Sequence, residues 1–131
     1  MLLLDTHIWL WWINGTPDKL SSSLLERIEH AETVAVSAIS CFELEWLARH
    51  GRIELDISLD DWFSGALSET EIICLPVTGQ IARLAASLPE HHKDPQDRLI
   101  IATAINNNCH LVSADKQFSH YKEISRLLVQ A

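Results

Sequence analysis

The sequence predicts an α/β fold of three layers, in which helices cover both faces of a central, mostly parallel β-sheet. Short apolar runs of strand length alternate with helical patterns along the chain, which is typical of βαβ units. Several of these runs are apolar throughout, as expected for strands that are buried on both faces. With 131 residues, of which 47% are hydrophobic, residues 1–131 are expected to fold as a single domain.

The first strand and the first helix are predicted at the start of the chain. Leu2–Leu4 is a short apolar run that suits a buried strand. Thr6–Ile13 is apolar and aromatic, as in a short helix, and Gly15, Thr16 and Pro17 then break the chain. Three tryptophans fall within four positions of this helix. Because they cannot all face inward, at least one is expected at the surface or in an interface.

A second helix, a second strand and a third helix are predicted next. Leu20–Glu29 carries apolar residues at helical spacing after a cluster of serines. Thr33–Ser37 is rich in β-branched residues and suits a strand. Ser40–His50 is expected to be a helix that ends at Gly51, since glycine commonly follows the last turn of a helix.

The middle of the chain continues the alternation of helices and strands. Ser58 suits the N-cap of a helix over Asp60–Leu67. Ile72–Leu75 is a short apolar strand that Pro76 stops. Gly79–Ser87 has the composition of a helix and ends before a proline.

The last predicted elements are one long helix and one or two strands. Asp94 and Pro95 suit the N-cap and first position of a helix that includes Arg98–Asn107. His110–Val112 is expected to be a strand, and a final strand or turn is expected around Ile124.

The net charge of the chain is −8, and no targeting or membrane segment is visible. This charge has the wrong sign for an enzyme that holds phosphate backbones, unless part of the acidic excess binds metal. The apolar run after Asp5 is far shorter than the roughly 20 residues of a membrane span. We therefore expect a soluble, cytoplasmic protein without a membrane partner.

Four acids stand where a predicted strand ends or a predicted helix begins: Asp5, Glu43, Asp97 and Asp115. In an open parallel sheet these points share one edge, where such folds build their active sites. Four carboxylates at one place repel each other, so a site made of them requires a divalent cation. The pattern indicates phosphodiester chemistry.

Each acid also has a possible structural role that the sequence leaves open. Asp5 and Asp115 suit turns or N-caps. Ser40 and Glu43 form the pattern of a capping box, in which Glu43 bonds back to the start of its own helix. Asp94 is assigned to capping, which leaves Asp97 free to face the site. The neighbouring residues His91 and His92 are expected to be solvated on a loop, because adjacent side chains diverge.

Five segments then bear on the family of the protein: Leu3–His7, Ser37–Leu44, Gly51–Ile53, Asp94–Ala102 and Leu111–Asp115. In this order and spacing they make the chain resemble a PIN-domain ribonuclease, and most closely the VapC toxins of bacterial toxin–antitoxin pairs. The resemblance covers nearly the whole chain and implies a PIN-like α/β/α fold. No single segment is specific by itself.

The resemblance implies a metal-dependent endoribonuclease. Asp5, Glu43, Asp97 and Asp115 would be its catalytic acids and would hold one or two Mg²⁺ or Mn²⁺ ions. The chain departs from the family after the central glutamate, where relatives often carry a lysine and this chain has Glu45–Leu47.

Several residues near the acids are candidates for contact with RNA. Arg98 and Lys116 flank acids in the sequence, and Arg49 lies beyond Glu43, so they are predicted to form a local basic rim. Ser113 is predicted to lend its hydroxyl to the turn, to the metal or to the substrate.

The resemblance also implies protein partners, namely a second copy of the chain and a cognate antitoxin. Two other functions remain open at this point. One is a magnesium-dependent phosphatase or phosphotransfer domain with an aspartyl nucleophile, although Asp5-Thr6-His7 lacks a second aspartate two positions on. The other is a non-catalytic scaffold whose acids only cap helices.

Overall fold

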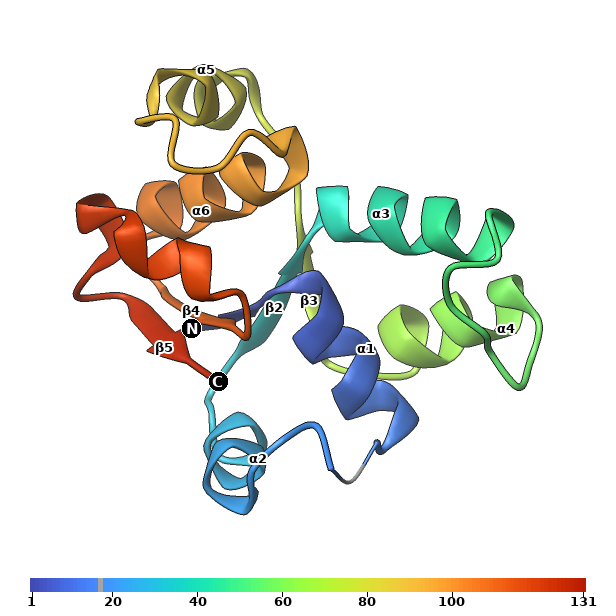
Figure 1. The fold of residues 1–131 in the computed structure, drawn as a ribbon. Coiled ribbons are helices and arrows are strands. Elements are labelled where there is room, and N and C mark those ends of the chain that lie inside the picture. Colours follow the sequence, from blue (N-terminus) through green and yellow to red (C-terminus); the bar gives the residue numbers. More distant parts are fainter. Residues whose placement is uncertain (17) are drawn as a thin grey trace.

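Five short strands form one sheet at the centre of the computed structural model, which describes residues 1–16 and 18–131 (Figure 1). The order is β3-β2-β1-β4-β5, and all four pairs of neighbours are parallel. The predicted three-layer α/β fold is confirmed, with a sheet that is parallel throughout. The strands are β1 (Leu2–Leu4), β2 (Val34–Ser37), β3 (Ile73–Leu75), β4 (His110–Ser113) and β5 (Leu128–Gln130).

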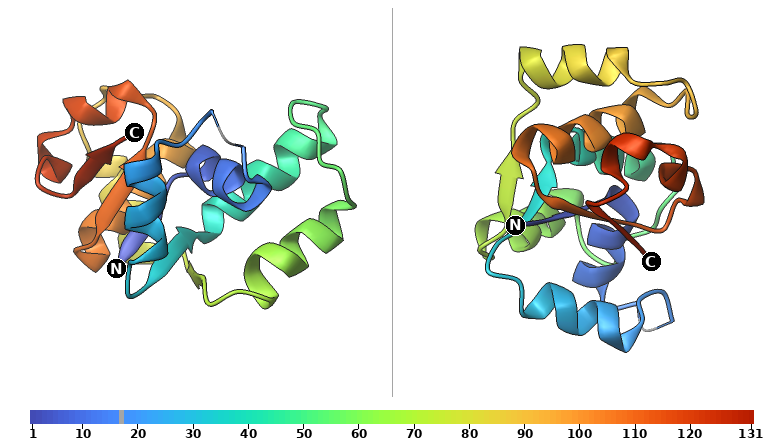
Figure 2. Two further views of the ribbon diagram at one scale, coloured as in Figure 1. Left: turned by 90° about the horizontal axis from the view of Figure 1, so that it is seen from below. Right: turned by 90° about the vertical axis from the view of Figure 1, so that its left-hand side faces the viewer.

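Helices connect these strands and cover the sheet (Figures 1 and 2). The helices are α1 (Thr6–Asn14), α2 (Ser22–Glu29), α3 (Ala38–Arg49), α4 (Leu59–Phe63), α5 (Gly79–Ser87) and α6 (Pro95–Asn107). The π-helical segment η1 (Ser64–Ser68) continues α4, and two 3-10 segments, η2 (Lys116–His120) and η3 (Lys122–Ile124), lead to β5.

Successive residues of the central strands point to opposite faces, and both faces are buried. Leu2 and Leu4 of β1 pack with α1, α2 and α4 on one face. Leu3 packs on the other face with α6, η2 and η3. α5 packs against the outer side of α6, where its Ile81 meets Ala102. Burial on both sides explains why the sequence of β1 is apolar throughout.

The ends of two helices differ from the prediction. α1 ends at Gly15, whose positive φ of 62° suits glycine, as the expected break requires; Pro17 lies outside the described residues. α3 begins at Ala38 instead of Ser40, because the side chain of Ser37 caps it by accepting a hydrogen bond from the Ile39 amide. Around Ile124 the chain forms a 3-10 turn, and the last strand follows it.

The tryptophans divide as their spacing predicts. Trp9 is fully buried and packs edge-on against Trp62, with ring centroids 5.2 Å apart. Trp11 and Trp12 are only half-buried at the edge of the same core.

Within residues 1–16 and 18–131, none of the helices has the length and apolar character needed to cross a membrane.

Candidate functional site

The carboxyl ends of β1, β2 and β4 lie along one edge of the sheet, because these strands are parallel neighbours. Asp5 follows β1 directly, and Asp115 comes two residues after β4. Glu43 lies on α3, which begins at the end of β2, and Asp97 lies in the first turn of α6. The fold therefore brings the four predicted acids to one place.

Asp5 is the most buried of these acids and is held on both oxygens. Its Oδ1 accepts a hydrogen bond of 2.7 Å from the Thr6 amide, and its Oδ2 accepts one of 2.7 Å from the Ser113 hydroxyl. The Asp5 amide also donates to the Val112 carbonyl, which fixes Asp5 beside β4. Burial raises the pKa of Asp5, and these hydrogen bonds oppose the rise. Asp5 thus caps α1 and faces the site at once.

Glu43 does not form the capping box that its spacing suggests. Because α3 begins two residues earlier than predicted, Glu43 lies beyond its first turn, and the Ser40 hydroxyl instead lies 2.8 Å from that of Thr6. The carboxyl group is half-buried. Burial first, and then repulsion from Asp5 and Asp94, raise its pKa to about 7. The alternative in which Glu43 only caps its helix is wrong.

Asp94 and Asp97 divide their roles as the sequence predicts. Asp94 is the N-cap of α6 and accepts a hydrogen bond of 2.9 Å from the Gln96 amide. Asp97 makes no such bond, and its side chain is 15% exposed. Burial raises its pKa to about 8, with repulsion from Asp5, Asp94, Glu43 and Asp115 adding to the rise. Asp97 is the acid whose pKa is raised by the largest number of other carboxylates.

Asp115 combines capping with a place in the site. Its Oδ1 accepts a hydrogen bond of 2.9 Å from the Gln117 amide at the start of η2. Its Oδ2 lies 3.1 Å from Nε2 of His92, which also lies 2.8 Å from Oδ2 of Asp97. The expectation that His92 is solvated on a loop is therefore wrong, although its neighbour His91 is exposed. The sequence offers no signal for this beyond the position of His92 just before α6.

Two of the residues predicted to contact RNA lie in the interior instead. Arg98 is 9% exposed, and its guanidinium donates to the carbonyls of Ala86, Leu88, Pro89 and His92. Ser113 is fully buried and donates to Asp5. Neither position suits contact with a substrate, and this expectation is corrected for both residues.

The other two candidates for RNA contact are exposed. Lys116 follows Asp115 at the start of η2. Arg49, at the end of α3, forms an ion pair with Glu45 one turn before it. Their contact with RNA remains a prediction.

The donor groups of this site fit a hard divalent cation. Four carboxylates meet at one edge, and the pKa values of three of them are raised, which means that their negative charges lack sufficient compensation. Carboxylate oxygens are the preferred ligands of Mg²⁺ and Mn²⁺. The oxygens of Asp97 and Asp115 lie within 4.8 Å of one another and of a ring nitrogen of His92, which is close enough to hold such an ion. Asp5 and Glu43 lie near enough for their charges to raise the pKa of Asp97.

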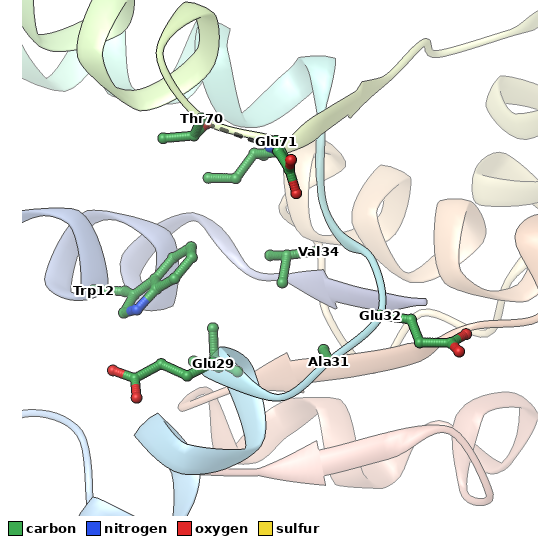
Figure 3. A pocket seen from close by; sticks show the side chains of 9 residues that line it. Trp12, Glu29, Ala31, Glu32, Val34, Thr70 and Glu71 are labelled. Atoms are coloured by element: carbon green, nitrogen blue, oxygen red, sulfur yellow. Dashed lines mark hydrogen bonds between the residues drawn. The ribbon is translucent and has the colours of Figure 1, made fainter.

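A cleft of about 290 Å³ lies elsewhere and shares none of these acids. It is lined by apolar residues that include Trp12 and Val34, with Glu29, Glu32 and Glu71 around it (Figure 3). Val34 is the first residue of β2, so this cleft is at the amino edge of the sheet. The four acids lie at the opposite, carboxyl edge of the sheet, so this cleft is separate from the candidate site.

Comparison with known proteins identifies the family. The PIN domain matches residues 2–124, and the chain belongs to the PIN-domain family. The resemblance predicted from the sequence is confirmed. Among individual relatives, Ribonuclease VapC22 of Mycobacterium tuberculosis is 38% identical over 122 residues, which are 92% of this chain and 92% of that protein.

Solved structures share the fold at lower identity. VapBC2 from Rickettsia felis, bound to a promoter DNA fragment, matches with a TM-score of 0.70 and 19% identity over 98% of this chain and 97% of that chain. A toxin–antitoxin complex from Klebsiella pneumoniae matches with a TM-score of 0.66 and 20% identity, over 99% and 97%. These likenesses support the same α/β architecture.

The raised pKa values predict how the stability of the metal-free protein depends on pH. The pKa of Asp97 rises from 3.8 to about 8, and that of Glu43 from 4.5 to about 7. At pH values between the unfolded and the folded pKa of each group, the folded chain binds more protons than the unfolded chain. Its free energy of unfolding therefore falls as pH rises through this range. We expect a loss of several kcal/mol, at most about 6, between about pH 5 and about pH 8, because each group contributes about 1.4 kcal/mol per pH unit below its raised pKa. Urea unfolding in EDTA measures it.

The substitution Asp97→Asn tests the source of this loss. It removes the charge that the other acids oppose, so the variant should be more stable than the wild type at the higher pH and should depend less on pH. Glu26→Gln, which removes an exposed charge on α2, is the control and should keep the wild-type slope. An equal slope in Asp97→Asn and the wild type would contradict the prediction.

Proposed function

We propose that this chain is a metal-dependent endoribonuclease and the toxin of a type II toxin–antitoxin pair. The observation that carries the proposal is the convergence of Asp5, Glu43, Asp97 and Asp115 at one edge of the sheet, with uncompensated charge. Membership of the PIN-domain family and the likeness to a protein named as a ribonuclease support it.

The residues of the site have distinct tasks in this proposal. Asp5, Glu43, Asp97 and Asp115 would hold Mg²⁺ or Mn²⁺. When bound, the ion lowers the pKa of a water nucleophile and stabilises negative charge on the phosphate. Ser113 and the Thr6 amide fix the carboxylate of Asp5 by hydrogen bonds to both of its oxygens, so this carboxylate is already oriented before metal arrives.

The two other functions considered from the sequence have less support. A phosphatase of the haloacid type has a second aspartate two positions after its nucleophile, where this chain has His7, and such a mechanism leaves Glu43 without a role. A scaffold whose acids only cap helices does not explain Asp97. This residue is half-buried in the first turn of α6, and the N-cap of that helix is Asp94.

Removal of single carboxylates tests the proposed reaction. Asp5→Asn and Asp97→Asn should each lower the rate of RNA cleavage by about 100-fold or more, because a neutral amide binds a divalent cation weakly. Cleavage of a labelled RNA is measured with Mg²⁺ or Mn²⁺ and with EDTA, which should abolish it. Asp60→Asn, an exposed aspartate on α4, is the control. Cleavage that persists in EDTA or in both site variants would rule the proposal out.

Lys116 is the residue best placed to hold the RNA backbone beside the acids. It is exposed and follows Asp115. Lys116→Glu should weaken RNA binding and reduce the slope of log affinity against log salt by about one phosphate contact. The matched control is Lys122→Glu, an exposed lysine on η3. Equal affinities and equal salt slopes for the two variants, measured by fluorescence anisotropy, would remove Lys116 from the RNA site.

A cognate antitoxin and a second copy of the chain are the protein partners of this proposal. The solved structures that share the fold include complexes with antitoxins. α3 carries an exposed apolar patch, formed by Phe42 at 56% and Trp46 at 42% exposure, with Trp46 stacked on His50. Apolar patches of this kind usually mark interfaces. A protein toxin that cuts RNA would act in the cytoplasm, as predicted from the sequence.

Trp46→Asp tests the role of this patch, because a charge in an apolar interface is costly to bury. We expect weaker self-association, weaker binding of the co-expressed antitoxin, or both, by analytical ultracentrifugation. The control is Ile57→Asp, at an exposed position outside α3. If Trp46→Asp retains both assemblies, the patch is not an interface.

A further inference from the structure

His92 is fixed in the site by contacts with the main chain and with two buried residues. Its amide donates a hydrogen bond of 2.9 Å to the hydroxyl of Tyr121, which is fully buried. Its carbonyl accepts a hydrogen bond of 3.3 Å from the guanidinium of Arg98. Both partners are buried, so the backbone of His92 has little freedom to move.

The ring of His92 has a defined hydrogen-bonding state. Its Nδ1 accepts a hydrogen bond of 3.3 Å from the Asp94 amide. A ring nitrogen that accepts carries no proton, so the proton of the neutral imidazole is on Nε2. Nε2–H therefore donates to Oδ2 of Asp115 at 3.1 Å, and Oδ2 of Asp97 lies 2.8 Å from the same nitrogen.

This state opposes a role of His92 as a metal ligand. The group formed by His92, Asp97 and Asp115 is compact enough to hold an ion. A ligating histidine, however, binds through an unprotonated nitrogen and usually donates its other N–H to an acceptor. Here the other nitrogen, Nδ1, faces a donor, the Asp94 amide. The geometry suits an imidazole that donates to the Asp115 carboxylate and leaves metal binding to the two carboxylates.

We propose that His92 is a positioning residue, which binds the carboxylate of Asp115 by its Nε2–H, keeps it beside the carboxylate of Asp97 and so prepares the two groups to bind the metal ion. The inference rests on the proposed function for the identity of the ion. The two carboxylates repel one another, and an N–H donor between them opposes their separation. Each carboxylate offers about four lone-pair sites, so donation from His92 leaves others for metal.

Arg98 and Tyr121 do not contact the carboxylates and instead hold the main chain of His92. Arg98 ties the carbonyl of His92 to the carbonyls of Ala86, Leu88 and Pro89. The segment between α5 and α6 is thereby held around one guanidinium. This accounts for a buried arginine beside the site that donates only to main-chain carbonyls.

Binding of Mn²⁺ alone, measured by calorimetry without RNA, tests the proposal. His92→Ala should bind Mn²⁺ at least about 10-fold more weakly than the wild type, as is usual when a partner of a metal ligand is lost. His92→Gln places an amide N–H near the position of Nε2 and should recover most of the affinity. The matched control is His91→Ala, in which the neighbouring exposed histidine is removed. Circular dichroism verifies that each variant is folded.

Two spectroscopic measurements distinguish positioning from ligation. Long-range ¹⁵N NMR of the metal-free protein should show His92 with its proton on Nε2. Pulsed electron paramagnetic resonance of the Mn²⁺-bound protein should show no coupling to a histidine nitrogen. Unchanged or tighter Mn²⁺ binding in His92→Ala, a proton on Nδ1, or a coupled histidine nitrogen would each overturn the proposal.

Failure of this inference differs from failure of the proposed function. A wild-type protein that binds Mn²⁺ but does not cut RNA refutes the ribonuclease and leaves the role of His92 intact. A His92→Ala variant that binds Mn²⁺ as the wild type does refutes the role of His92, even if the wild type cuts RNA. A wild-type protein that binds no Mn²⁺ refutes both.

Discussion

Mutual repulsion among carboxylates at one edge of the sheet is the constraint on which the rest of the structure depends. Parallel strands direct Asp5, Glu43, Asp97 and Asp115 to the same edge, and burial makes their charges harder to accommodate. A fold that keeps such groups together must hold the backbone firmly. The two apolar layers on either side of β1 supply that rigidity.

The polar residues beneath the acids serve the same purpose at shorter range. Ser113 links the end of β4 to Asp5, which itself follows β1. It also accepts a hydrogen bond of 3.0 Å from the Asp115 amide, so one hydroxyl contacts two of the acidic residues. Thr6 and Ser40 form the corresponding contact between α1 and α3. These hydroxyls can be buried because each has a hydrogen-bond partner. A buried hydroxyl without one would lower the stability of the fold by about 1–3 kcal/mol.

Most of the fold follows from local sequence, whereas the details of the site do not. Apolar runs such as Leu2–Leu4 and the pair Asp94–Pro95 mark their elements directly. Ser37 and Ser40 are equally good caps by type, and the choice depends on pairing of Ser37 with Leu75 on β3, a contact across the sheet. The positions of His92 and Arg98 cannot be predicted from local sequence for the same reason. Their orientations depend on Tyr121 and on the carbonyls of residues 86–92, which no local pattern reveals.

The central position of β1 has a consequence for how the chain reaches its working state. β1 is made first, yet its neighbours are β2 and β4, and β4 comes much later in the sequence. Contacts between such distant segments form slowly and depend on each other. A chain that has been synthesised only as far as α5 lacks Asp97, Asp115 and one side of the sheet. The edge that carries the four acids is therefore completed only after α6 and β4 have been made, as a late event in folding.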